Sequence, residues 1–252
     1  MSSKIDWCDE TINPLGWGCY GPTGTAARPK PCSYCYAQRA SRGPWAAQRG
    51  CPLCQQFIPH WHPEMLEKPR GWRKSRRIFV QSMGDLLHPE TPAEHVQACI
   101  DLARELPRHT FIFLTKNPER YREFEFPGNS WIGATATNQK QWDRAIEALY
   151  QKQMDNLPRT DGWPTFFISA EPLISAIDPS SDCAFIDWLI IGADSTRGAK
   201  QPNPDWALEL INAAIVDAHI PVFMKDNLQP SLEPALGEIW MPLRQFPEVL
   251  DV

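Results

Sequence analysis

Three cysteines stand close together in the segment GCYGPTGTAARPKPCSYCYAQRA, which covers residues 18–40. Two residues separate Cys32 from Cys35, and twelve residues separate Cys19 from Cys32. Such a set could belong to a disulfide framework, a zinc site or an iron–sulfur cluster that keeps one position open. Because the N-terminal sequence has no apolar signal segment, we expect a reducing, cytoplasmic location, which disfavours disulfides.

A second pair with the same spacing, Cys51 and Cys54, follows Cys35 with fifteen residues between Cys35 and Cys51. Two such pairs at this distance are typical of a structural zinc site, here with Cys32, Cys35, Cys51 and Cys54 as ligands. That interpretation leaves Cys19 without a role.

Two histidines, His60 and His62 in the segment FIPHWHP, are further candidate ligands together with Cys51 and Cys54. Alternate residues of a strand point the same way, so this pair could bind one metal ion. The commoner explanation of such a pattern is a pair of ordinary, half-buried strand residues.

The iron–sulfur interpretation uses Cys19, Cys32 and Cys35. Three thiolates can bind three irons of a [4Fe–4S] cluster and leave the fourth iron open for a small molecule. A catalytic cluster needs such an open position, whereas a structural zinc site has none. The cysteine loop also follows a candidate first strand, ETINPL, which would place it at the mouth of a β/α barrel. The position of the loop therefore favours the cluster.

Apolar strands and amphipathic helices alternate along the rest of the chain. The expected strands are 10–15, 77–83, 110–116, 130–137, 165–171, 187–194 and 221–227, with a weaker candidate at 56–62. The expected helices are 36–42, 91–107, 117–125, 138–153 and 203–218. This alternation indicates a parallel sheet covered by helices.

We therefore predict an α/β fold with a single domain over residues 1–252, a parallel (β/α) barrel or partial barrel with the cysteine-rich loop after the first strand. The second cysteine pair lies in an expected insertion at about residues 43–62. A doubly wound sheet is the alternative, but it would usually offer a glycine-rich first turn, and the sequence has none.

Almost every expected strand ends in a polar residue. These residues are Asp85, Lys116, Thr135 with Asn138, Glu171, Asp194 with Ser195, and Lys225 with Asp226. The carboxyl ends of the strands of a β/α barrel line one mouth, where its chemistry takes place. Each residue alone is more often a helix cap or a loop hydrogen bond, but their recurrence predicts a polar mouth. Glu171 is the residue least easily explained as a cap.

The segment CSYCYA resembles the radical S-adenosylmethionine signature, in which an aromatic residue, here Tyr34, precedes the last cysteine. The whole chain resembles a phage-associated three-cysteine-motif family, a domain of unknown function. The matching segments are NPLGWGC, CSYCYAQR, HPEMLEKP, RIFVQSMGDLLHPETP, FIFLTKNPER, WIGATATNQ, FFISAEPL, WLIIGADS, NPDW and VFMK. SMGDLLHP and LTKNPER are also similar to parts of the spore-photoproduct-lyase-like branch of radical enzymes.

Three features depart from these patterns. The usual radical signature places far fewer residues between its first two cysteines than the twelve found here. The chain has GADS where the family has GGES, so that Asp194 takes the place of a glutamate. Cys51 and Cys54 look like an insertion that could hold an extra metal such as zinc or carry free thiols.

The resemblance implies that Cys19, Cys32 and Cys35 bind the [4Fe–4S] cluster and that S-adenosylmethionine binds its open iron. An electron donor such as flavodoxin or ferredoxin would then allow a 5′-deoxyadenosyl radical to form and to abstract hydrogen from an unactivated carbon. The expected cofactor-binding residues are Tyr34, Tyr36, Ser82, Asp85 and Thr115. The expected catalytic residues are Lys116, Glu171, Asp194 and Lys225.

The resemblance also points to a modified pyrimidine in phage DNA as the substrate, for example a hypermodified thymine that the enzyme would isomerise. A free modified nucleotide and a peptide are the alternatives. The basic segment KPRGWRKSRR, residues 68–77, could contact phosphates and stack Trp72 on a base, although a solvated loop is the commoner explanation. The net charge of −5 gives no general attraction to nucleic acid.

Two other classes of function stay open. A zinc-binding β/α scaffold that serves a phage partner protein would be colourless and would not need Cys19. A metal-dependent hydrolase fits less well, because no His-x-His follows the first strand. The sequence has no run of about eighteen apolar residues, so we expect no membrane contact. A phage-encoded protein of this kind would act in the cytoplasm of the infected cell.

Overall fold

The computed structural model describes residues 5–43, 50–155, 162–179, 182–236 and 241–247. Its strands form a seven-stranded sheet in the order β1-β2-β3-β4-β5-β6-β7. They are β1 (Glu10–Ile12), β2 (Arg77–Val80), β3 (Thr110–Thr115), β4 (Ser130–Thr135), β5 (Thr165–Ala170), β6 (Trp188–Ile191) and β7 (Val222–Met224). The pairings of β1 with β2, β2 with β3, β5 with β6 and β6 with β7 are parallel.

The order of the strands in the sheet follows their order in the chain. A β/α barrel or partial barrel has this order, whereas a doubly wound sheet reverses direction at a switch point. The predicted fold class, an α/β protein with a parallel sheet of the partial-barrel type, is therefore confirmed.

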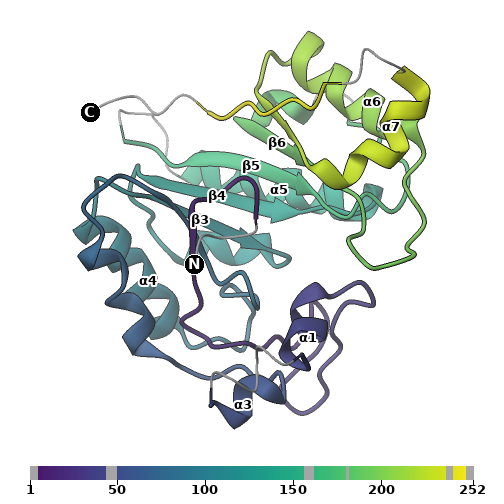
Figure 1. The fold of residues 1–252 in the computed structure, drawn as a ribbon. Helices are drawn as coiled ribbons and strands as arrows, with labels where there is room; N and C mark the ends of the chain where they lie inside the picture. Colours follow the sequence, from purple (N-terminus) through teal and green to yellow (C-terminus); the bar gives the residue numbers. More distant parts are fainter. Residues whose placement is uncertain (1–4, 44–49, 156–161, 180–181, 237–240, 248–252) are drawn as a thin grey trace. The chain divides into compact units, whose positions relative to one another are not determined.

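Helices form at four of the predicted places, 36–42, 91–107, 138–153 and 203–218, whereas 117–125 forms a 3₁₀ turn (Figure 1). The helices at 52–55 and 229–236 were not predicted. The α-helices are α1 (Tyr36–Ser41), α3 (Pro52–Gln55), α4 (Ala93–Glu105), α5 (Gln139–Asp155), α6 (Pro204–Asn212) and α7 (Gln229–Leu236). Short 3₁₀ turns are η1 (Pro63–Leu66), η2 (Pro69–Gly71), η3 (Pro118–Glu123), η4 (Asp182–Phe185) and η6 (Asp226–Leu228), and η5 (Ala213–Asp217) is a π-helical turn.

The weaker strand candidate at 56–62 is wrong. The chain there is irregular and forms no strand. Pro59 and Pro63 lack the backbone N–H that a strand ladder needs, which explains the failure. The expected insertion at about 43–62 is described from residue 50 onward and at residue 43, while residues 44–49 lie outside the described part of the chain.

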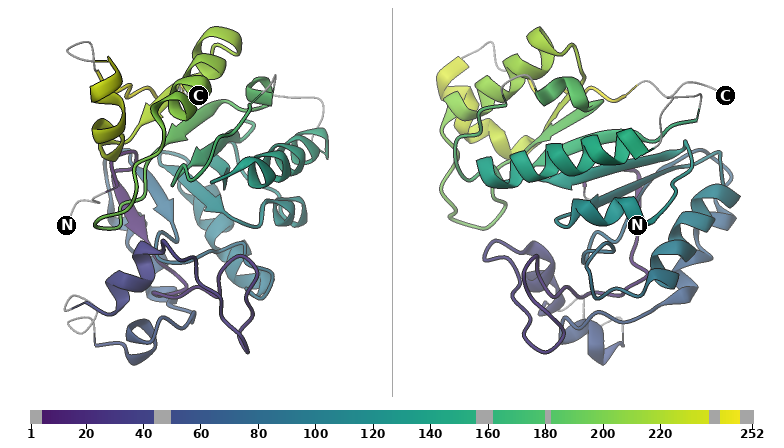
Figure 2. Two further views of the ribbon diagram at one scale, coloured as in Figure 1. Left: turned by 90° about the vertical axis from the view of Figure 1, so that its right-hand side faces the viewer. Right: turned by 180° about the vertical axis from the view of Figure 1, so that it is seen from behind.

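The chain divides into two compact units, the first formed by Met1–Trp131 with Thr160–Pro164 and the second by the rest. The first unit contains β1, β2 and β3 with α1, α3 and α4, and α1 lies next to α3 in both figures (Figures 1 and 2). The second unit contains β5, β6 and β7 with α5, α6 and α7. Helix α4 buries one apolar face, made of Val96, Cys99, Ile100, Leu102 and Ala103.

Two ion pairs join β1 and the segment before it to the start of β2. Asp9 Oδ2 accepts a hydrogen bond from Arg77 N (2.7 Å), and Asp9 Oδ1 lies 3.0 Å from Arg77 Nη2. Arg76 Nη1 lies 2.8 Å from Glu10 Oε1. Two of the arginines in the basic segment therefore have a structural partner on the neighbouring strand.

These contacts predict a pH-dependent contribution of Asp9 to stability. Burial raises the pKa of the Asp9 carboxyl, but the hydrogen bonds and charge of Arg77, with the charge of Arg76, bring it below its ordinary value. A lowered pKa in the folded state means that the stabilisation is present above the unfolded-state pKa of about 3.9. It is lost as the pH falls through the folded-state pKa.

We expect Asp9→Asn to lower the free energy of unfolding at pH 7 by about 1 kcal/mol or less, because the pair is partly exposed. The difference from wild type should shrink below about pH 4, as the wild-type carboxyl takes up its proton. Denaturant unfolding at several pH values measures both effects. Asp143→Asn, at an exposed position of helix α5, is the control, and an Asp9→Asn difference independent of pH would contradict the assignment.

Candidate functional site

A loop that is closed by a backbone hydrogen bond connects Cys19 with Cys32 and Cys35. Lys30 N donates to Tyr20 O at 2.7 Å, so the neighbours of Cys19 and Cys32 lie side by side in spite of the twelve intervening residues. Cys35 N donates to Cys32 O at 3.0 Å and closes the next turn. The long spacing is therefore compatible with one shared ligand set.

Backbone amides donate to two of these sulfurs. Gly21 N donates to Cys19 Sγ at 3.2 Å. Cys35 caps the N-terminus of α1, and its Sγ accepts a hydrogen bond from Gln38 N at 3.3 Å. Cys19 and Cys35 also pack against an apolar cluster made of Trp17, Ala37, Cys54, Phe57 and Met83. Amide donors and a helix N-terminus both favour the thiolate form, which is the form that binds metals.

Burial and negative neighbours oppose ionisation of the same thiols. Burial raises the pKa of Cys19 to about 12, with contributions from the charges of Asp85, Cys35 and Cys32. Burial also raises the pKa of Cys35, and the charge of Cys32 adds to this, while Lys116 lowers it. Thiolate forms of Cys19 and Cys35 would therefore need compensating positive charge, which a metal centre would provide. Among the described residues, the side chains close enough to form a metal-ligand group are Cys51, Cys54, His60 and His62, not these three cysteines.

The carboxylate of Asp85 joins the loop after β2 to the end of β3. Its Oδ1 accepts hydrogen bonds from Thr115 Oγ1 (2.6 Å) and Leu87 N (3.1 Å). Its Oδ2 accepts from Lys116 N (3.0 Å) and Asn117 Nδ2 (2.9 Å). These contacts give Asp85 a positioning role. Its expected contact with a cofactor, like that of Thr115, stays a prediction.

Other predicted residues lie in the same unit. Lys116 Nζ lies 5.7 Å from the centre of the Tyr34 ring. The Tyr36 hydroxyl donates to Ser82 O, and Ser82 Oγ donates to Asn13 Oδ1 at 3.2 Å. The structure thus connects the cysteine helix α1 with the loop after β2.

Sequence reasoning missed two side chains that hold this region. Asn13 Oδ1 also accepts a hydrogen bond from Met83 N at 2.8 Å. Gln81, which is buried and has φ of 67°, accepts from Leu15 N and donates to Gly16 O, both at 2.9 Å. The available signal for Gln81 was a polar residue inside the apolar run RIFVQSM.

The second unit contains a separate polar group. Lys225, after β7, forms an ion pair with Glu171, after β5. A Cβ atom on Gly192 would lie 3.0 Å from Lys225 Cδ and 3.1 Å from Glu171 Cγ, so glycine leaves room for the pair. Asp194 has different partners, because its Oδ1 accepts from Thr196 N (2.8 Å) and Thr196 Oγ1 (2.6 Å).

Two further asparagines near strand ends have structural roles. Asn138 Oδ1 accepts a hydrogen bond from Gln141 N at 3.1 Å and so caps helix α5. Asn227, which sequence reasoning missed, accepts from Ala193 N (3.0 Å) and donates to Ala193 O (2.7 Å). The polar strand ends in the second unit therefore include both structural caps and the Glu171–Lys225 pair.

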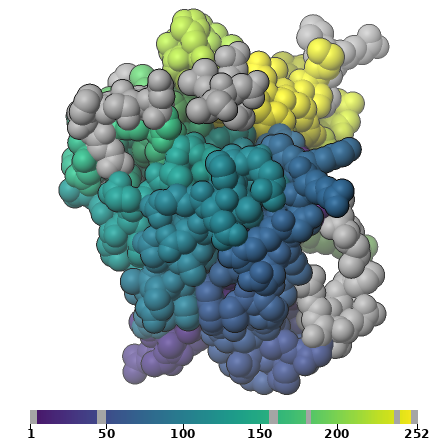
Figure 3. Space-filling view, turned by 90° about the vertical axis from the view of Figure 1, so that its left-hand side faces the viewer, coloured from purple at the N-terminus to yellow at the C-terminus, as the bar shows by residue number. Residues whose placement is uncertain are grey.

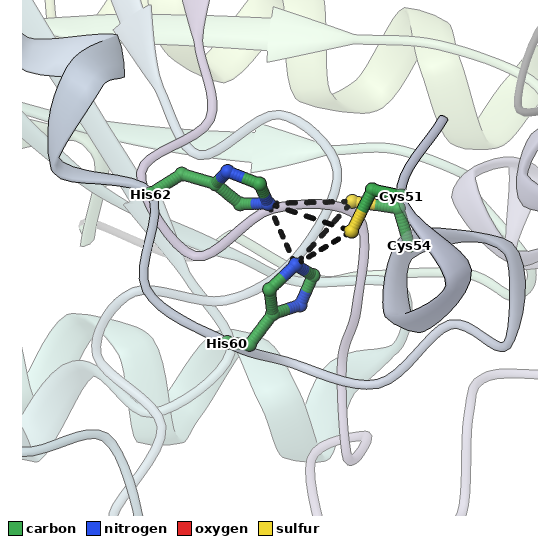
Figure 4. A group of neighbouring side chains, drawn as sticks. All are labelled: Cys51, Cys54, His60 and His62. Atoms are coloured by element: carbon green, nitrogen blue, oxygen red, sulfur yellow. Dashed lines mark hydrogen bonds between the residues drawn. The ribbon is translucent and has the colours of Figure 1, made fainter. Parts of the chain in front are cut away.

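Cys51, Cys54, His60 and His62 form a Cys2His2 group whose ligand atoms all lie within 4.8 Å of one another (Figure 4). Such a set of two thiols and two imidazoles can hold a metal ion such as zinc. The hydrogen bond from the Cys54 backbone lowers the pKa of Cys51 to about 6, and contacts with Cys54, His62 and His60 side chains add to this while burial opposes it.

This group corrects the four-cysteine zinc interpretation. The structure combines Cys51 and Cys54 with the two histidines, as the sequence allowed, and not with Cys32 and Cys35. All eight cysteines are free of disulfides.

The comparisons identify a family for the chain. Searches against curated proteins and against solved structures return no significant match. Among the described helices, none combines the length and apolar character that a membrane crossing requires. The model of the family described as "Protein of unknown function (DUF5131)" matches residues 2–229. The chain therefore belongs to the DUF5131 family.

Proposed function

We propose that the protein is a radical S-adenosylmethionine enzyme that binds a [4Fe–4S] cluster through Cys19, Cys32 and Cys35. What supports this most is that the three thiols follow β1 in one segment and affect one another electrostatically, with Asp85 acting on Cys19 and Lys116 on Cys35. β/α proteins of the barrel type carry their chemistry at the carboxyl ends of the strands. Three ligands leave one iron of the cluster for the cofactor.

When bound, the cluster and S-adenosylmethionine would supply hydrogen-atom abstraction from an unactivated carbon, with electrons from a flavodoxin- or ferredoxin-like donor. The chain itself provides the setting. Gly21 N and Gln38 N donate to the cysteine sulfurs. Asp85 fixes the backbone of Lys116, whose ammonium brings positive charge near Cys35. A cation at this place suits the carboxylate of the cofactor.

The proposed cluster ligands can be tested by metal analysis and substitution. Wild-type protein purified without oxygen should contain about four irons and four sulfides per chain, and Cys32→Ala should lose the brown colour and the cleavage of S-adenosylmethionine. Iron and sulfide analysis, a visible spectrum and chromatography of the cleavage products measure this. Cys99→Ala is the control, because Cys99 is a buried thiol on α4.

Two results would reject the proposal. One is cofactor cleavage by Cys32→Ala at the wild-type rate. The other is a colourless wild-type protein that contains zinc and no iron and does not depend on Cys19. The second result would favour the non-catalytic zinc scaffold.

We further propose that Glu171 and Lys225 bind polar groups of the substrate. They form an ion pair in the second unit, and both side chains are about one-fifth exposed, at 22% and 17%. Such a pair can exchange its internal contact for a ligand with a matching charge. Asp194 is less suited to this role, since its carboxylate holds the turn to Thr196.

The proposal separates substrate binding from cofactor cleavage. Lys225→Met and Glu171→Gln should retain iron and the slow formation of 5′-deoxyadenosine without substrate, but should lose at least about tenfold in substrate turnover, since a hydrogen bond to a charged group contributes about 1.5–3 kcal/mol. Gly192→Ala should have a smaller effect in the same direction, because its methyl group displaces the pair. Loss of substrate-free cleavage in Lys225→Met would mean that Lys225 serves the cofactor instead.

A modified pyrimidine in DNA is the substrate that we propose, on the basis of the family resemblance and the basic segment 68–77. Arg76 of this segment pairs with Glu10 and lies 5.4 Å from the Trp72 ring, whereas Arg73 and Lys74 are exposed. In Figure 3, the blue atoms, which belong to the part of the chain around residues 50–100, form much of the lower part of the visible face. Arg73 and Lys74 are therefore the better candidates for phosphate contacts.

The DNA proposal predicts salt-dependent binding. Arg73→Gln/Lys74→Gln should weaken binding to duplex DNA and reduce the slope of log K against log salt by about 0.9 per lost phosphate contact. Fluorescence anisotropy at several salt concentrations measures the slope. Lys140→Gln/Lys200→Gln removes the same charge from two other exposed positions and is the matched control. Equal effects of the two double variants, or binding that does not depend on salt, would contradict the proposed contact.

A further inference from the structure

The distances within the Cys2His2 group fit the coordination sphere of one ion. Four Sγ···Nε2 distances join its cysteines and histidines, and they are 3.1, 3.9, 3.7 and 3.7 Å. Zinc bonds of about 2.3 Å to sulfur and about 2.0 Å to nitrogen, at tetrahedral angles, separate such atoms by about 3.5 Å. The four observed distances lie on both sides of this value.

The hydrogen bonds of the two rings leave their inner nitrogens ready to bind a cation. His60 Nδ1 lies 2.8 Å from Ile58 O, and His62 Nδ1 lies 2.6 Å from Glu64 Oε1. Because a carbonyl and a carboxylate accept hydrogen bonds, each Nδ1 carries the hydrogen, and each neutral ring directs the lone pair of Nε2 inward.

The two Nε2 atoms lie 2.6 Å apart, with both cysteine sulfurs around them (Figure 4). Two lone pairs at this distance repel each other unless a positive charge lies between them. A metal ion would satisfy all four donors together and would open the distance between the nitrogens to about 3.3 Å.

We infer that the Cys2His2 group binds one zinc ion in a closed structural site and that this ion fixes segment 14–18, which leads into Cys19. Two thiolates and two imidazoles in a tetrahedral arrangement are typical of structural zinc, and four protein ligands leave no position for a substrate. The metal site is independent of the proposed function, whereas its effect on the cluster rests on it.

Segment 14–18 lies directly against the metal-binding side chains and their backbone. His60 N donates to Leu15 O (3.2 Å), and His62 N donates to Pro14 O (2.6 Å). Trp17 N donates to Cys54 Sγ at 3.3 Å. The ligand loop and the segment before Cys19 are thus joined by three hydrogen bonds, one of them to a ligand sulfur.

Gly16 shows how closely the two parts approach. A Cβ atom at this position would lie 2.7 Å from His60 Cε1, 2.9 Å from His62 Cδ2 and 3.1 Å from Cys54 Sγ. Its φ of 63° is also a conformation that favours glycine. Substitution of Gly16 would therefore disturb the site without removing a ligand.

The test measures zinc and iron separately in the full-length protein by elemental analysis. Wild type should contain about one zinc per chain. Cys51→Ala and His60→Ala should lose it, whereas Cys183→Ala, which removes another thiol, should keep it. Cys32→Ala should keep the zinc while losing the iron. Glu64→Gln should weaken zinc about tenfold in competition with a chelating dye, because the carboxylate orients His62.

The effect on Cys19 is tested by the same preparations. Cys51→Ala and Gly16→Ala should incorporate less iron than wild type although all three cluster cysteines are present. Iron incorporation equal to that of wild type in both variants would overturn the coupling. Zinc without iron in wild type would reject the proposed function and support the Cys2His2 zinc site. Iron without zinc would reject the zinc site and support the proposed function.

Cobalt(II) gives a test that does not depend on folding of the ligand variants. Added to the Cys19→Ala/Cys32→Ala/Cys35→Ala protein, it should show the intense tetrahedral bands and sulfur charge-transfer absorption of a two-cysteine site. Absence of these bands would overturn the inference. So would zinc that persists in Cys51→Ala but is lost from Cys32→Ala, since that result would assign the metal to the other cysteines.

Discussion

The position of segment 14–18 is the constraint that connects the Cys2His2 group with Cys19, one of the proposed cluster ligands. On one side, the side-chain amide of Gln81 accepts a hydrogen bond from Leu15 N and donates one to Gly16 O. On the other side, the backbone of His60 and His62 donates to the carbonyls of Leu15 and Pro14. The segment has little freedom to move, because the side chains of His60, His62 and Cys54 fill the space beside Gly16. Cys19 follows this segment directly, so the segment also fixes the backbone of Cys19.

Charge balance is the second constraint on the first unit. Asp85 is buried beside Cys19, and its charge opposes ionisation of that thiol. The protein satisfies the carboxylate with four hydrogen bonds, which come from the ends of two adjacent strand regions. Backbone amides also donate to the thiols of Cys19 and Cys35, but burial still raises the pKa of both. Added positive charge would therefore stabilise the thiolates of Cys19 and Cys35 most, and a metal centre bound there would provide it.

Much of the fold was predictable because buried parallel strands appear in the sequence as short runs of apolar residues. The runs at 110–116, 130–137 and 165–171 contain β3, β4 and β5 as the structure places them. Their alternation with helices was enough to indicate the sheet type. The failed candidate at 56–62 also contains apolar residues, but Pro59 within it and Pro63 directly after it lack the N–H of a ladder donor. Its backbone instead forms hydrogen bonds to segment 14–18.

The sequence predicted which types of residue form the candidate sites, but it did not predict which of these residues contact one another. From spacing alone, Cys51 and Cys54 could share a metal ion with either Cys32 and Cys35 or His60 and His62. Only the folded path of the chain decides between these two ligand sets. Likewise, the basic character of Arg76 and Arg77 suggested phosphate contacts, but their carboxylate partners precede them by 66 and 68 residues in the chain. Contacts between residues so far apart in sequence leave no local pattern.

A zinc site beside a cluster loop is physically reasonable because this part of the chain has little regular structure. Between α1 and β2, the described residues form only the single turn α3 and the short turns η1 and η2. Ordering such a segment costs about 1–2 kcal/mol of backbone entropy per residue, with few ladder hydrogen bonds to offset it. Metal binding can supply that free energy, and a closed ligand set does so without competing for a substrate. If the proposed function holds, one set of cysteines would stiffen the loop, and Cys19, Cys32 and Cys35 would leave a position open for the cofactor.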